Sequence, residues 1–170
     1  MLNRFFEWKN IRGFVTYAVY LLLTLVLQSL LFSRISIFGV KGFIVPAAAV
    51  AAGIYFGGVK GAIFSLVLGV LTDIGAPETT VLYTVLFPMI GFGAGLASEF
   101  YINKSFFAFM VFSTVAILIT GFAQLAGAMI FASAGLMKGM LTVLLQAVLS
   151  LLPTALLYLP FRNYKGRIRR

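Results

Sequence analysis

The sequence predicts an all-α polytopic membrane protein, folded as one bundle of about six transmembrane helices. Of its 170 residues, 62% are hydrophobic and only 10% are charged. Its mean hydropathy is +1.08. Soluble domains are typically about half apolar and about a quarter charged. Charged residues and glycines divide the apolar residues into separate runs along the whole chain. We therefore expect a single integral membrane domain over residues 1–170.

The apolar runs give the expected spans in order. These are about 13–33, 42–57, 61–73, 79–98, 105–131 and 139–161. The first run is long enough to cross and has no small-residue cleavage site, so it is predicted to be an uncleaved anchor rather than a signal peptide. A spanning helix needs about 20 apolar residues, and the second and third runs are shorter than that. We expect them to borrow residues from Ile35–Lys41 and from a hairpin at Gly57–Lys60.

Positive charge predicts the orientation in the membrane. The net charge is +9, from 13 Lys and Arg against 4 Asp and Glu. The basic residues lie at the ends of apolar runs and form no continuous face, which argues against nucleic acid as a partner. Six spans place both termini on one side, and basic residues favour the cytoplasmic side. With cytoplasmic termini, ten bases lie inside (Arg4, Lys9, Arg12, Lys60, Lys104, Arg162, Lys165, Arg167, Arg169, Arg170) and three outside (Arg34, Lys41, Lys138).

Small residues recur at every fourth position from residue 57 to residue 73. These positions hold Gly57, Gly61, Ser65, Gly69 and finally Asp73. On a helix this spacing makes a ridge of small side chains, and small residues let two membrane helices approach closely. The ridge therefore predicts either packing within the bundle or a surface for a partner helix. Residues Gly91 and Gly95 repeat the spacing in the fourth span, where we expect them to pack against the ridge.

Polar residues in or near the spans have two interpretations each. Asp73 is either a carboxylate that ends a helix at the water interface or a group that binds a partner, since ionisable groups at membrane depth are often functional. Mid-span Gln28, Gln124 and Gln146 either make interhelical hydrogen bonds or line a polar pocket for a small ligand.

Several kinds of chemistry lack their usual residues. The sequence contains no cysteine and no histidine. No carboxylate lies at the centre of a predicted span, as an ion or proton relay would need. The four acidic residues have no catalytic spacing, and no phosphate-binding loop is present. We expect neither an enzyme nor an ion-driven transporter, and no metal or cofactor.

The order of short motifs over about Leu25–Glu99 resembles the rod-shape-determining MreD family. The motifs are Leu27–Phe32, Ile35–Lys41, Gly58–Phe64, Gly69–Asp73, Leu82–Tyr83 and Ile90–Gly95. The chain departs from the family pattern after Lys41, at Ser65 and after Asp73. Beyond this part of the chain only the pattern of spans is similar.

The resemblance implies a non-catalytic membrane scaffold of the bacterial cell-elongation machinery. Such a scaffold binds the single-span protein MreC, and through it connects peptidoglycan synthases outside to the MreB filament inside. It helps to control cell shape and peptidoglycan synthesis. The expected location is the cell membrane, with several spans and with both termini cytoplasmic.

The MreD architecture is also similar to the substrate-binding subunits of energy-coupling-factor vitamin transporters, which are six-span proteins of about this length. The alternative function is therefore the binding of a small molecule such as a vitamin, as one subunit of a transporter.

Overall fold

A computed structural model describes residues 19–26, 28, 36–37, 40–75, 81–100, 105–132 and 136–162. Residues 19–26 are helical. They are followed by two short strands and five helices. These are β1 (Ser36–Ile37), β2 (Val40–Lys41), α2 (Val45–Phe56), α3 (Gly58–Gly75), α4 (Leu82–Phe100), α5 (Phe106–Ala132) and α6 (Leu136–Arg162).

Four of these helices are long and apolar enough to cross a membrane, so the chain is an α-helical, multi-pass membrane protein. They are α3, α4, α5 and α6. The fifth apolar helix, α2, has 12 residues and spans only about 18 Å at 1.5 Å per residue, against a hydrocarbon core of about 30 Å. Most of the expected first span, 13–33, lies outside the described residues.

The second expected span does not extend toward its N-terminus. Instead of helix, the residues before it form β1 and β2, an antiparallel pair in which Ser36 lies opposite Lys41. Pro46 explains this start, because proline fits the first turn of a helix but removes a hydrogen bond and clashes in its interior. A helix that began near Ile35 would have Pro46 in its interior. The expectation of a longer second span was therefore wrong.

The third span extends beyond 61–73 by borrowing residues from Gly57–Lys60, as expected, and the expected hairpin is reduced to one residue. Gly57 has φ +89°, and its N–H donates to the Gly53 carbonyl at 3.0 Å, which ends α2. Helix α3 begins at the next residue, so the residues up to Lys60 form its first turn. The reversal is this short because glycine reaches a positive φ without a steric penalty.

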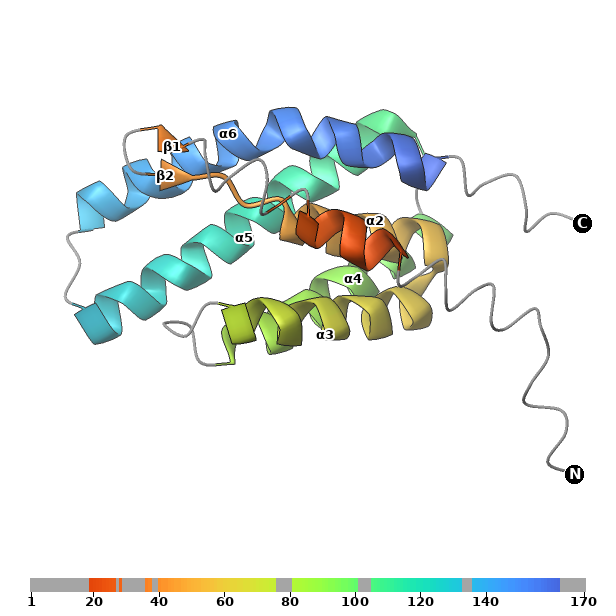
Figure 1. The fold of residues 1–170 in the computed structure, drawn as a ribbon, viewed down its shortest axis with the longest axis horizontal. Helices are drawn as coiled ribbons and strands as arrows, with labels where there is room; N and C mark the ends of the chain where they lie inside the picture. Colours follow the sequence, from red (N-terminus) through yellow and green to blue (C-terminus); the bar gives the residue numbers. More distant parts are fainter. Residues whose placement is uncertain are drawn as a thin grey trace, which may run out of the picture.

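Helix α2 lies in the middle of the bundle and is buried along its whole length. It contacts the pair α3 and α4 on one side and the pair α5 and α6 on the other (Figure 1). Alanines dominate its first half, which allows neighbouring helices to come close. Toward its C-terminus Tyr55 packs on Tyr158 of α6, with ring centroids 6.3 Å apart. A short, fully buried helix thus forms the core around which the longer helices are arranged.

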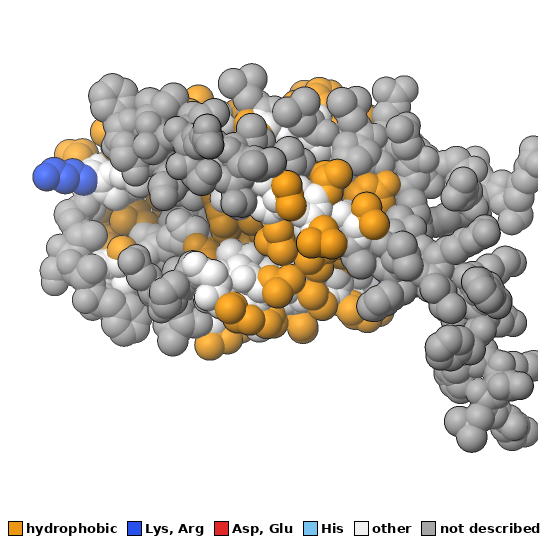
Figure 2. All heavy atoms as spheres, viewed as in Figure 1, with side chains coloured by type: hydrophobic (Ala, Val, Ile, Leu, Met, Phe, Trp, Pro, Cys, Tyr) orange, Lys and Arg blue, Asp and Glu red, His pale blue; other side chains and the backbone are white. Residues whose placement is uncertain are grey.

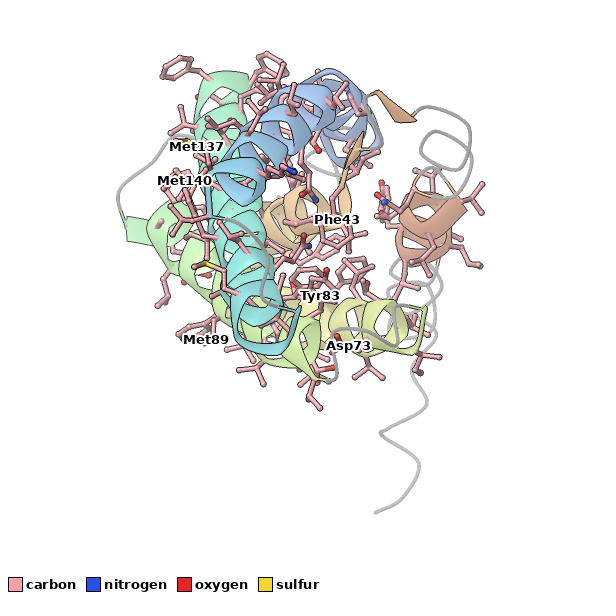
Figure 3. The ribbon with its side chains drawn as sticks, turned by 90° about the vertical axis from the view of Figure 1, so that its left-hand side faces the viewer. Phe43, Asp73, Tyr83, Met89, Met137 and Met140 are labelled. Carbon is pink, nitrogen blue, oxygen red and sulfur yellow. The ribbon has the colours of Figure 1, made fainter. Side chains whose placement is uncertain are left out.

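The outer sides of the long helices are apolar. Figure 2 shows apolar side chains gathered on one face of the molecule, over α3 and the helix at residues 19–26. The exposed apolar side chains of α3 include Val59, Ile63 and Val67. In the view along the bundle, Met89, Met137 and Met140 lie on the outside of α4 and α6 (Figure 3). Exposed apolar area of this extent suits hydrocarbon rather than water.

Candidate functional site

The small-residue ridge of α3 is covered from inside the chain. A Cβ atom added at Gly61 would lie 2.5 Å from the Cα of Gly53 in α2. One added at Gly69 would lie 2.9 Å from the Cα of Thr84 in α4. Between them the Ser65 hydroxyl donates to the Ala49 carbonyl at 3.4 Å. The ridge is therefore a contact surface for α2 and α4.

Glycines of α2, α3 and α4 meet at one junction. A Cβ atom at Gly53 would collide with the backbone of Gly91 and would lie 2.9 Å from the nitrogen of Gly95. A Cβ atom at Gly91 would lie 3.0 Å from the Cβ of Ser65, and one at Gly95 would lie 2.6 Å from the nitrogen of Gly58. Real Cβ atoms essentially never come within 3.0 Å of another heavy atom, and the neighbours of Gly53 and Gly95 are backbone atoms, so the packing of the three helices depends on glycine at these positions.

The predicted candidates divide into three groups in the structure. Gly61, Ser65, Gly69, Gly91 and Gly95 all lie between helices of this chain. Gly57 is not part of the ridge, because it ends α2 with a positive φ. Asp73 lies at the end of α3 and faces the start of α4.

Asp73 caps helix α4. One of its carboxylate oxygens, Oδ2, accepts a hydrogen bond from the backbone N–H of Thr84 at 2.7 Å and from the Thr84 hydroxyl at 2.6 Å. The other, Oδ1, accepts from the backbone N–H of Tyr83 at 3.2 Å. The first N–H groups of a helix have no partner within the helix, and the helix dipole favours negative charge there. Within the chain, Asp73 therefore has the role of a helix-end carboxylate.

A second carboxylate makes the corresponding contact at the opposite end of the same helix pair. The Glu99 carboxylate, near the end of α4, accepts from the backbone N–H of Gly58 at the start of α3, with a long separation of 3.4 Å. Glu99 was not among the predicted site residues. Only its position near the end of α4 could have indicated this contact. The antiparallel pairing that brings Asp73 to the start of α4 also brings Glu99 to the start of α3.

The non-helical residues before α2 are held by side chains of two other helices. The Gln28 amide accepts from the backbone N–H of Ile44 at 2.9 Å and donates to the Gly42 carbonyl at 3.3 Å. The Ser150 hydroxyl, in α6, accepts from the backbone N–H of Phe43 at 2.8 Å. Non-helical backbone at membrane depth requires partners of this kind, because hydrocarbon offers none. Gln28 therefore makes hydrogen bonds within the bundle, but its partners are the non-helical backbone before α2 and not another helix.

Aromatic rings join this segment to α4. The Phe43 ring lies 5.3 Å from that of Tyr83 and 6.2 Å from that of Phe87, measured between centroids. Phe43 and Tyr83 lie near each other in the middle of the bundle, with Asp73 below them (Figure 3). The Gln124 amide of α5 donates to the Tyr83 hydroxyl at 2.6 Å. Tyr83 therefore connects the Asp73 cap, the start of α2 and helix α5.

Gln124 and Gln146 also line one cavity, between α5 and α6. Its volume is about 480 Å³, and it is open rather than enclosed. Thr142 and Lys138 contribute its other polar side chains. The structure thus brings two of the three predicted amides together, and it places Gln28 elsewhere. Among the described residues, no group of three His, Cys, Asp or Glu side chains could hold a metal ion.

Comparisons with known protein families, curated proteins and solved structures give no match to this chain.

Proposed function

We propose that the protein is a non-catalytic scaffold of the bacterial cell-elongation machinery that binds MreC and helps to control cell shape and peptidoglycan synthesis. The proposal starts from the resemblance to the MreD family. Its main support is that the resembling motifs between Gly58 and Gly95 form one structural unit, the pair α3 and α4. Gly61 and Gly69 in α3, and Gly91 and Gly95 in α4, make contacts between helices that leave no room for a side chain. These motifs contain the residues through which α3 and α4 pack. Proteins that share a fold are expected to share such packing residues.

The internal packing of the ridge restricts where a partner could bind. Gly53, Gly91 and the backbone at Thr84 already cover it, so a partner helix has no room there. MreC would instead bind to lipid-facing sides such as the face of α3 that carries Ile63 and Val67. Its contacts would be side chains packed against side chains, as is common between membrane helices that lack glycine at the contact.

The proposed topology has six membrane-embedded segments with both termini in the cytoplasm. The ten-to-three distribution of basic residues in the sequence supports it. Lys60 lies in the first turn of α3 and Lys138 in the first turn of α6, which begin at opposite ends of the bundle (Figure 1). This arrangement agrees with Lys60 on the cytoplasmic side of the membrane and Lys138 on the outer side. MreB filaments and peptidoglycan synthases are reached through MreC in this proposal.

Affinity purification in mild detergent tests the function. The tagged protein is expected to recover MreC from membranes of its native host. A tagged variant in which Ile63 and Val67 are both changed to Ala tests the docking face, and the matched control changes the exposed Val111 and Val115 of α5. Failure of the wild-type protein to recover MreC, with its fold intact, would contradict the scaffold role.

The alternative is a vitamin-binding subunit of an energy-coupling-factor transporter. One observation favours it, namely the cavity of about 480 Å³ between α5 and α6, a size common for small-molecule sites. This function requires that the same purification recover an ATPase module, or that the purified protein carry a bound vitamin detectable by mass spectrometry. Either result would replace the scaffold proposal.

A further inference from the structure

The cavity between α5 and α6 has a polar side that runs inward from the end where these helices are connected. On α6 the residues Lys138, Thr142 and Gln146 line it at spacings of four residues, so they share one face. At 1.5 Å per residue, Gln146 lies about 12 Å deeper along the helix than Lys138. Leu125 and Ala128 of α5 form part of the apolar wall opposite.

Two of the polar groups in this cavity already have partners in the chain. The Thr142 hydroxyl donates to the Lys138 carbonyl at 2.9 Å, and the Gln124 amide donates to the Tyr83 hydroxyl at 2.6 Å. These bonds fix the two side chains against the cavity wall. They leave the charge of Lys138 and the amide of Gln146 as the groups that a bound molecule could use.

The side chains of Lys138 and Gln146 have no ion-pair or hydrogen-bond partner within the part of the chain that the structure describes. An amide without a hydrogen-bond partner is strongly disfavoured in an apolar medium. At the depth of Gln146, few groups other than water or a bound molecule can supply that partner. Lys138, near the membrane surface, can bind an anion without being desolvated completely.

We propose that this cavity binds an anionic membrane lipid. The lipid phosphate lies at the Lys138 ammonium, its ester region provides an acceptor for the Gln146 amide, and an acyl chain follows the apolar wall at Leu125. The order of a cation near the surface, an amide below it and apolar side chains beside both matches the order of groups in a phospholipid. An open cavity also allows a lipid to enter from the bilayer. This inference does not depend on the scaffold function.

Native mass spectrometry of the full-length protein in detergent tests the proposal. The protein is titrated with phosphatidylglycerol, which is anionic, and with phosphatidylcholine of the same chain length, which has no net charge. We expect tighter binding of phosphatidylglycerol. Lys138→Gln should weaken that binding by about tenfold, the size expected for losing one charge-assisted hydrogen bond. Gln146→Leu should weaken the binding of both lipids, because both contain ester groups.

Lys60→Gln is the matched control, since it removes one exposed lysine from the first turn of α3, outside the cavity. Thermal unfolding in the same detergent shows whether each variant is folded. Equal affinity for the two lipids, or an equal loss from Lys60→Gln and Lys138→Gln, would overturn the proposal. Competition by inorganic phosphate as effective as that by the lipid would also overturn it, because it would assign the site to a free anion.

A co-purified vitamin displaced by Lys138→Gln would likewise overturn the lipid proposal, and it would favour the transporter alternative. Failure to recover MreC would leave the lipid result unaffected. The two proposals can therefore fail separately.

Discussion

Asp73 and Glu99 cap each other's helices. Asp73, at the end of α3, accepts from the N–H groups at the start of α4, and Glu99, at the end of α4, accepts from the Gly58 N–H at the start of α3. Each carboxylate thus lies at the positive end of the neighbouring helix dipole. Polar contacts hold the helices α3 and α4 together at both ends, and glycine contacts hold them together in the middle. Three separate sets of contacts therefore fix the antiparallel register of the two helices.

The Asp73 cap predicts a loss of stability when its carboxylate is removed. Asp73→Ala should lower the free energy of unfolding by about 0.5–2 kcal/mol, the usual range for a helix cap. Asp73→Asn keeps an acceptor and should cost less. Thermal unfolding in detergent measures both. If Asp73→Asn keeps its stability but loses MreC recovery, the carboxylate charge acts on the partner, and the helix-end role alone is insufficient.

The glycine junction predicts different effects of the same substitution at different positions. Gly61→Leu and Gly69→Leu place a side chain into the backbone of α2 or α4, and overpacking of this kind costs about 1–3 kcal/mol or more. Gly93→Leu is the matched control, because an added Cβ at this exposed position in α4 meets no atom within 4 Å. Complementation of a shape-defective strain, at equal protein levels, should fail for the first two variants and succeed for the third. Normal complementation by Gly61→Leu would contradict close packing there.

The start of α2 depends on hydrogen bonds from distant side chains. Gln28→Leu and Ser150→Ala each leave a backbone N–H without its partner, at Ile44 or at Phe43. An unsatisfied buried donor costs about 1–3 kcal/mol, so each variant should unfold at a lower temperature. Thr142→Ala is a control on α6, since its exposed hydroxyl bonds only within its own helix. Equal melting temperatures for the three variants would show that water or another group replaces these bonds.

The topology predicts which positions are accessible from outside the cell. The natural chain has no cysteine, so single cysteines can be introduced without background. Lys138→Cys should react with a membrane-impermeant maleimide in intact cells, whereas Lys60→Cys and Arg169→Cys should react only after lysis. Reaction of Arg169→Cys in intact cells would reverse the assigned orientation.

The close contacts between α3 and α4 were predictable because they depend on a local pattern. Four-residue spacing of glycines is a property of one helix, and it indicated close packing before any partner was known. The non-helical start of α2 was not predictable in this way, although Pro46 marks it. Its stability depends on Ser150, which lies 107 residues from Phe43 in the chain. The capping role of Glu99 was equally hidden, because it requires knowledge of which helices are paired.

The separation between Phe43 and Ser150 has a consequence for biosynthesis. The segment before α2 enters the membrane early, but the hydroxyl that satisfies the Phe43 N–H belongs to α6, which leaves the ribosome after the other described helices. Until α6 is inserted, that donor stays without its final partner, and α2 cannot reach its lowest free energy. A chain truncated before Ser150 would keep this defect permanently, and a membrane quality-control protease could therefore distinguish it from a chain that contains α6.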